Sequence, residues 1–143
     1  MTTTNKNVIT IGGSENYLDI EEGFSLIDAS LKKHKINKKN LMIYAYAPTQ
    51  KDTREKGGAQ LIAEKWAEKY KLELVVGNPN PQKHNGDWKA ALDARNKFLA
   101  EKSKLLINFS KASKNGGEGI IKEFQALGKP VEKVGEVKED TQV

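Results

Sequence analysis

The chain alternates short apolar runs with longer stretches in which apolar residues recur every three or four positions. The run LLINF at Leu105–Phe109 has the length and composition of a buried strand. The apolar residues Ile20, Phe24, Ile27 and Leu31 are spaced by four, three and four positions, so they form one stripe along a helix. The two periods therefore separate strands from helices along the whole chain.

These patterns predict five strands alternating with four helices. Residues 47–57 form a polar loop, and the segment GNPNPQKHNGD after the third strand holds prolines and glycines that exclude regular structure. The predicted strands are Asn7–Ile11, Leu41–Ala45, Leu72–Val76, Leu105–Phe109 and Val131–Val134, and the predicted helices are Ile20–His34, Gly58–Tyr70, Trp88–Lys102 and Gly119–Leu127.

Regular alternation of strand and helix predicts the fold class. Parallel strands joined by right-handed helical crossovers give an α/β fold, a three-layer, doubly wound, mainly parallel five-stranded sheet of the Rossmann-like type. We expect residues 1–143 to form a single domain, with residues 1–6 and 135–143 flexible. Ligands of such sheets bind beyond the carboxyl ends of the strands, so residues directly after strands are the candidates for function.

The composition argues against several classes of function. No apolar run approaches the roughly 20 residues that cross a bilayer, and the N-terminal residues lack the apolar core of a signal peptide, so we expect a cytoplasmic protein with no membrane partner. The chain has no cysteine, and His34 and His84 lie far apart. We therefore expect neither a metal site nor a cofactor.

The positive charge has an unusual composition. The net charge is +5, yet Arg54 and Arg95 are the only arginines among 24 basic residues. The lysines alternate with acids, as in EKWAEKYKLE, a pattern typical of solvated helix faces. Binding of nucleic acid thus stays possible but is the less favoured interpretation.

Glycines follow three of the predicted strands. Gly12-Gly13-Ser14 comes after the first strand, Gly57-Gly58-Ala59 opens the second helix, and Asn115-Gly116-Gly117-Glu118-Gly119-Ile120 opens the fourth. Glycines there let backbone amides approach an anion at a helix N-terminus. Tight turns or a flexible connector would use the same residues, and the spacing matches neither a dinucleotide fingerprint nor a P-loop.

The third helix carries the pair Arg95-Asn96. Such a pair either lies on the solvent face of the helix or is present because the planar guanidinium of arginine can donate two parallel hydrogen bonds to a ligand. Trp66 is expected in the core, Trp88 is a packing or stacking residue, and His84 lies in the preceding loop. Asp87 is a candidate for binding ribose hydroxyls.

The order of these motifs resembles the SLOG superfamily, which includes the LOG phosphoribohydrolases, the DNA-processing protein DprA and small YspA/YpsA-like proteins. The resemblance covers residues 7–134 and is nearest to the small single-domain branch. Glu15 stands where that branch has arginine, and Ile120 stands where the LOG signature has threonine. The residues that match are Gly13, Ser14, Tyr17, Asp19, Gly58, Ala59, Ala63, Trp66, Ala67, Asp87, Trp88, Lys89, Ala90, Ala91, Arg95, Asn96, Gly116, Gly117, Gly119 and Glu123.

The resemblance implies a module that binds a nucleotide or nucleotide-derived molecule, such as an ADP-ribose-like compound or a nucleoside phosphate, and senses or sequesters it. Backbone amides would hold phosphates together with Arg95, while Asn96 and Asp87 would bind sugar hydroxyls and Trp88 or Tyr17 would cover the base. The expected ligand-binding residues are Gly13, Ser14, Tyr17, Gly58, Ala59, Asp87, Trp88, Arg95, Asn96, Gly116, Gly117, Glu118, Gly119 and Ile120.

Two other functions stay open. By the same resemblance, Arg95 and Glu123 would be the catalytic pair of a phosphoribohydrolase that cleaves the N-glycosidic bond of a nucleoside 5′-monophosphate. Analogy with DprA suggests single-stranded nucleic-acid binding, which predicts a steep dependence on salt. Relatives in this class frequently dimerise, so we expect a homo-oligomer.

Overall fold

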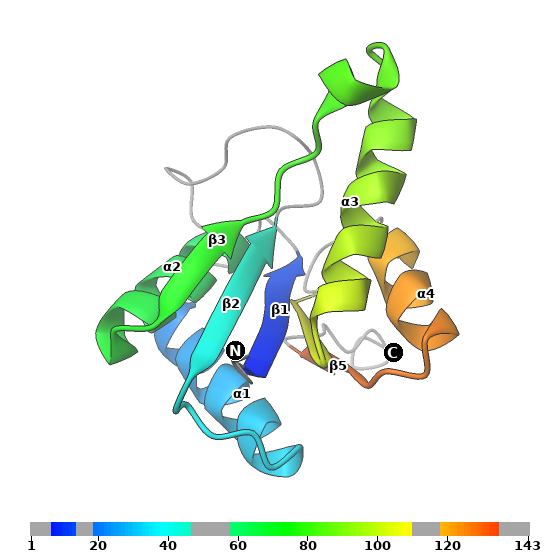
Figure 1. Cartoon of the computed structure of the whole chain (residues 1–143). Helices are drawn as coiled ribbons and strands as arrows, with labels where there is room; N and C mark the ends of the chain where they lie inside the picture. Colours follow the sequence, from blue (N-terminus) through cyan, green and yellow to red (C-terminus); the bar gives the residue numbers. More distant parts are fainter. Residues whose placement is uncertain (1–6, 14–18, 47–57, 110–117, 135–143) are drawn as a thin grey trace, which may run out of the picture.

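The computed structural model describes residues 7–13, 19–46, 58–109 and 118–134, which form one five-stranded sheet with helices on both faces (Figure 1). All neighbouring strands are parallel, and their order is β3-β2-β1-β4-β5. The predicted α/β fold with a doubly wound parallel sheet is confirmed. The strands are β1 (Asn7–Gly13), β2 (Leu41–Tyr46), β3 (Glu73–Val76), β4 (Leu105–Phe109) and β5 (Val131–Val134).

The helices match the predicted ones, and no helix end differs from the prediction by more than one residue. They are α1 (Ile20–Lys33), α2 (Ala59–Tyr70), α3 (Trp88–Lys102) and α4 (Glu118–Ala126). The segments 1–6, 47–57 and 135–143, expected to be flexible termini and a polar loop, lie outside the described residues.

The segment after β3 differs from the prediction. Regular structure is not excluded there, because residues Pro81–His84 form one turn of 3-10 helix, η2. The Asn80 side chain accepts a hydrogen bond from the backbone N–H of Gln82 at 3.1 Å, and Pro81 has the φ that a first helical position needs. Asn85 ends the turn in the left-handed conformation. Proline here starts a helical turn rather than preventing one.

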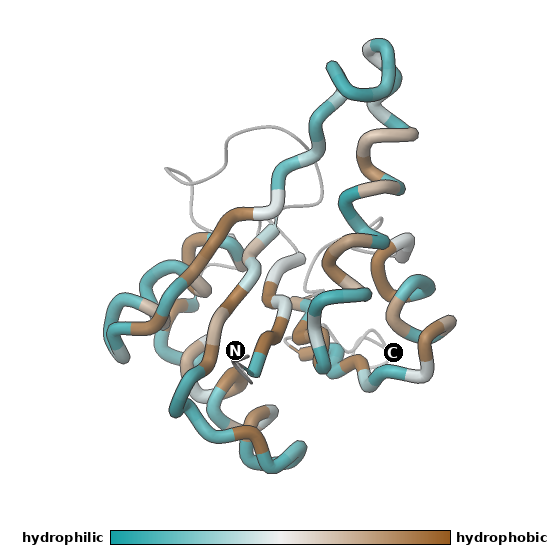
Figure 2. The backbone as a smooth tube through the Cα atoms, viewed as in Figure 1, coloured by the Kyte–Doolittle hydropathy of each residue, from teal (hydrophilic) through white to brown (hydrophobic). Residues whose placement is uncertain are grey.

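The sheet separates two apolar cores, because successive side chains of a strand point to opposite faces. Ile9 and Ile11 of β1 pack against α1 and α2, whereas Leu106 of β4 packs against α3 and α4. Figure 1 shows α1 and α2 behind the sheet and α3 and α4 in front of it. In Figure 2 the hydrophobic residues follow the strands and the inner helix faces, and η2 is hydrophilic.

Trp66 anchors the core beneath α1 and α2. Its ring is fully buried, and its Nε1–H donates to Asp28 Oδ1 on α1 at 3.1 Å. Burial of the indole therefore leaves its one donor satisfied. The expectation that Trp66 is a core residue is confirmed.

An ion pair connects the end of α1 to the edge strand β5. Glu132 Oε2 lies 2.7 Å from His34 Nε2 and 3.0 Å from Lys33 Nζ. Partial burial raises the pKa of the Glu132 carboxyl, but the hydrogen bonds and positive charge of His34 and Lys33 outweigh it, so this pKa lies below its ordinary value. The ionised carboxylate is thus the form that the fold favours.

We expect Glu132→Gln to lower the free energy of unfolding by about 1 kcal/mol at neutral pH. The Glu132 pKa is lower in the folded chain than in the unfolded one, so its contribution is present above the ordinary pKa and is lost as the pH falls through the lowered value. Urea unfolding from neutral pH to about pH 3 should show the two proteins converging. The exposed Glu68→Gln is the matched control, and an equal loss in that variant would contradict the assignment to this ion pair.

Candidate functional site

The helices change face of the sheet between β1 and β4. The crossovers through α1 and α2 lie on one face, and those through α3 and α4 lie on the other. At such a switch point the connections from two neighbouring strands diverge, which leaves a crevice at the carboxyl ends. Gly13 and Phe109 pair at that position, so the candidate site is built around the ends of β1 and β4.

Three residues lie in register across the sheet at this edge. Gly12 of β1 pairs with Tyr46 of β2 on one side and with Asn108 of β4 on the other. A Cβ at Gly12 would overlap the Tyr46 ring and its carbonyl oxygen. The missing side chain lets the Tyr46 ring lie over β1 and reach β4. Gly12 therefore serves the packing of Tyr46, whereas the sequence predicted it in a turn.

Gly13 must also be glycine, for a different reason from Gly12. Its φ is +127°, and a Cβ there would collide with the backbone of Phe109. A residue with a side chain would strain this position and push β1 away from β4. The backbone of Gly13 thus lies close to the end of β4, where the sequence analysis expects a ligand.

The hydroxyl of Tyr46 lies 2.6 Å from the side-chain amide of Asn108. Burial raises the pKa of Tyr46 to about 12, an effect that the Asn108 hydrogen bond and the Arg95 charge partly offset. Asn108 is fully buried, and its Oδ1 has no hydrogen-bond partner among the described residues. Rotating the Asn108 amide by 180° would exchange Oδ1 and Nδ2. In either orientation, one polar atom of this amide has no hydrogen-bond partner among the described residues.

Arg95 lies against the ring of Tyr46. Its guanidinium carbon is 5.2 Å from the centroid of the Tyr46 ring, within the range of a cation–π interaction. Nη1 donates to the carbonyl oxygen of Gly77 at 3.0 Å, and Nε donates to Asn96 Oδ1 at 2.8 Å. These contacts fix the guanidinium plane between the end of β3 and α3.

Both members of the Arg95-Asn96 pair are buried. Arg95 is 8% exposed and Asn96 is 9% exposed. Of the two interpretations that the sequence left open, the solvent-face one is wrong, because α3 presents this pair to the sheet and to α4. Burial lowers the pKa of Arg95, and its proximity to Tyr46 partly opposes the shift, yet an arginine keeps its charge in proteins.

Asn96 also marks where α4 begins. A Cβ at Gly119 would lie 3.2 Å from Asn96 Nδ2, so α4 approaches α3 closely through a residue without a side chain. The N-terminal end of α4, with its partial positive charge, is thereby beside the Arg95-Asn96 pair. Ile120, by contrast, has its side chain in the core beneath α3 and α4.

Glu123 lies one turn further along α4. Residues four apart share a helix face, so Glu123 is on the side of α4 that Gly119 presents to α3. Its side chain is half-buried. Because α4 starts at the carboxyl edge of the sheet, Glu123 is about 6 Å further from that edge than Gly119.

The remaining predicted residues divide into three groups. Asp87 caps α3, since its side chain accepts from the N–H of Ala90 at 3.1 Å, and exposed Trp88 lies about 10 Å along the helix from Arg95. On the opposite face of the sheet, Gly58 is the N-cap of α2 with φ +98°, and Ala59 is buried. Glu118 is the first residue of α4, while Ser14, Tyr17, Gly116 and Gly117 lie outside the described residues.

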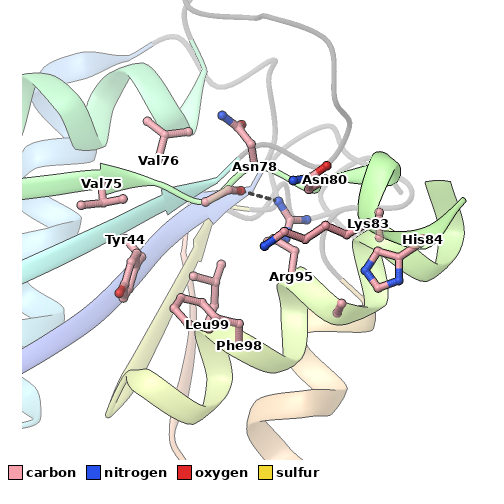
Figure 3. A pocket seen from close by; sticks show the side chains of 13 residues that line it. Tyr44, Val75, Val76, Asn78, Asn80, Lys83, His84, Arg95, Phe98 and Leu99 are labelled. Carbon is pink, nitrogen blue, oxygen red and sulfur yellow. Dashed lines mark hydrogen bonds between the residues drawn. The ribbon is translucent and has the colours of Figure 1, made fainter. Parts of the chain in front are cut away.

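A cavity of about 310 Å³ opens beside this cluster, between α3 and the β2–β3 side of the sheet. Arg95 lines it together with apolar side chains of β2, β3 and α3, and Lys83 and His84 contribute from η2 (Figure 3). Arg95 therefore belongs both to the buried polar cluster and to the cavity wall.

Sequence reasoning missed Tyr46 and Asn108. A signal existed for Asn108, because a single amide within the apolar run LLINF must find a partner once the strand is buried. No signal existed for Tyr46, since its position over Gly12 follows from the register of β1 with β2. The cavity residues Tyr44, Lys83 and Phe98 were also not expected.

Other kinds of site find no support in the described ranges. These residues include no group of three or more histidine, cysteine, aspartate or glutamate side chains that could hold a metal ion. None of the described helices combines the length and the apolar character that crossing a bilayer requires.

Comparison with known proteins adds no family assignment, since no family model, no curated protein and no solved structure matches this chain.

Removing the Tyr46 hydroxyl should destabilise the fold. Tyr46→Phe removes the partner of the buried Asn108 amide, so we expect the free energy of unfolding to fall by about 1–3 kcal/mol. The matched control is Tyr44→Phe on the same strand, whose half-buried side chain has no corresponding bond to Asn108. Chemical denaturation of both variants measures the difference, and equal losses would contradict this role of Tyr46.

The same residue predicts a dependence on alkaline pH. Tyr46 has a pKa of about 12 in the folded chain against 10.0 ordinarily, so the neutral phenol stabilises the fold up to about pH 10 and that contribution is lost as the pH rises toward 12. Absorbance titration of tyrosinate should show a late ionisation in the wild type that Tyr46→Phe removes. A late ionisation that persists in the variant would assign the shift to another tyrosine.

Proposed function

We propose that this protein binds a phosphorylated nucleoside-type small molecule at the carboxyl edge of the sheet, around Arg95 of α3, and acts as a sensing or sequestering module. The observation that carries the proposal is the position of Arg95, a buried cation whose side chain lines the wall of a cavity. Three independent features of the site support it.

The first feature is a rigid positive charge. Arg95 is fixed by Gly77, Asn96 and the ring of Tyr46, so little conformational entropy is lost when an anion approaches. A charge in a poorly hydrated site interacts more strongly with an opposite charge than the same charge in water.

The second feature is the start of α4. Gly119 brings the first turn of this helix against Asn96, and N-terminal turns provide backbone N–H donors and a partial positive charge. The third is the size of the cavity, because about 310 Å³ falls at the lower end of the range for small-molecule sites. A phosphate, a sugar and a ring together need such a volume.

A phosphoribohydrolase remains the alternative proposal within the same site. Glu123 faces α3 from α4, on the side where Arg95 and Asn96 are found, and a carboxylate there could orient water or stabilise a ribosyl cation. Binding without chemistry is favoured here because Glu123 lies a turn below the edge where the phosphate would sit. Release of free base from a nucleoside monophosphate would decide for the hydrolase.

Arg95 variants test the proposal. We expect adenosine 5′-monophosphate and ribose 5-phosphate to bind, and Arg95→Gln to weaken both by about 10- to 100-fold, because a charged hydrogen bond to phosphate is lost. Arg95→Lys keeps the charge but loses the planar fork and should bind with intermediate affinity. Calorimetry measures the affinities, and Lys97→Gln, an exposed cation on the same helix, should change them less than twofold.

Three outcomes separate the alternatives. Absence of binding to either phosphate compound, with folded protein by circular dichroism, would show the proposal to be wrong. Free base in the reaction, abolished by Glu123→Gln with affinity retained, would establish hydrolysis. Affinity for single-stranded nucleic acid that falls steeply with salt, and that Arg95→Gln leaves unchanged, would assign a different function.

A further inference from the structure

The β2–β3 side of the sheet is left uncovered on the α3 face. Helix α3 starts beyond the carboxyl end of β3 and crosses toward β4, so no described helix lies over β3 on this face (Figure 1). Val75 of β3 is 41% exposed and Phe98 of α3 is 46% exposed in consequence. These apolar side chains line the cavity that Arg95 also lines.

Two aromatic rings form one wall of this cavity. Tyr44 and Phe98 meet edge to face, with ring centroids 5.7 Å apart and planes inclined by 75°. Leu99 and Val75 complete the apolar surface around them. Lys102 Nζ lies 5.8 Å from the centroid of the Phe98 ring, and a third planar group can pack favourably against such an aromatic pair.

The positively charged side chains that line the cavity are Arg95 and Lys83. Arg95 lies on the α3 wall three residues before Phe98, on the same helix face, and the Lys83 side chain extends from η2 along the mouth (Figure 3). The site thus places a cation next to an aromatic surface within about 310 Å³. An anion without a ring would leave this apolar wall in contact with water.

We propose that the cavity between α3 and the β2–β3 edge binds the planar heteroaromatic ring of the ligand, with Phe98 and Tyr44 as its stacking surface and Arg95 and Lys83 at its anionic end. This inference rests on the proposed function and specifies that the cavity recognises the ligand by its ring. It replaces Trp88 and Tyr17 as the residues that cover the base.

The test compares two ligands that share a phosphate and differ in the ring. Phe98→Ala should weaken binding of adenosine 5′-monophosphate by about 5- to 100-fold, the range for loss of base–aromatic stacking, and should change binding of ribose 5-phosphate less than about twofold. Phe98→Leu keeps apolar bulk without the π face and should fall between wild type and alanine. Phe98 is half-exposed, so these variants are expected to fold, and their melting temperatures check this.

Leu127→Ala is the matched control, because Leu127 is an exposed large apolar residue after α4 and away from the cavity lining. It should leave both affinities unchanged. Lys83→Gln should weaken both ligands by a similar factor, since it acts on the anionic end.

Failure of the inference is distinguishable from failure of the proposed function. If both ligands bind with equal affinity and Phe98→Ala alters neither, the ring site is wrong while phosphate binding stands. If Trp88→Ala weakens the monophosphate selectively, the ring lies at the start of α3 instead. If Phe98→Ala changes the sedimentation coefficient but not the affinity, the aromatic wall is a contact between copies, and if neither ligand binds, both proposals fall.

Discussion

The site depends on one close approach, that of the Tyr46 ring over Gly12. Because Gly12 has no side chain, the ring crosses the central strand and its hydroxyl reaches Asn108 on the far side. The guanidinium of Arg95 lies against the same ring. Pairing of β2, β1 and β4 therefore brings together a polar cluster that no single segment could form. Because the paired strands hold the Tyr46 ring in place, they also restrict the movement of the guanidinium that contacts it. A cation positioned in this way needs little reorganisation when an anion arrives.

The cluster also carries an electrostatic cost that the fold accepts. Arg95 is 8% exposed and gives up much of its hydration, which its contacts with the Gly77 carbonyl, the Asn96 side chain and the Tyr46 ring partly replace. Asn108 adds a buried polar atom without a partner among the described residues. Buried polar groups of this kind reduce stability unless they are paired. Their concentration at the switch point, where the two apolar cores end, is what distinguishes this edge from the rest of the sheet.

Helix α3 connects the two halves of the proposed site. Its residues 95 and 98 share one face toward the sheet, so charge and aromatic surface follow each other along a single turn. The same helix leaves β3 uncovered because it must cross from one edge of the sheet to β4 on the opposite side of β1. The cavity is thus a consequence of strand order. The ligand chemistry that we propose for it follows from the cation and the aromatic ring that α3 contributes to its wall.

The sequence by itself determined the alternation of strands and helices, the parallel doubly wound sheet and the core position of Trp66, and it singled out Arg95 as a candidate, because hydrophobic period and residue rarity are local properties. It misjudged η2, where Asn80 and Pro81 make a helical turn. Only the tertiary structure decided that Gly12 accommodates Tyr46, that Asn108 lies beside it and that Phe98 borders the cavity. Those relations join residues 34 to 96 positions apart, and they arise from strand register and helix crossing, which no local pattern contains.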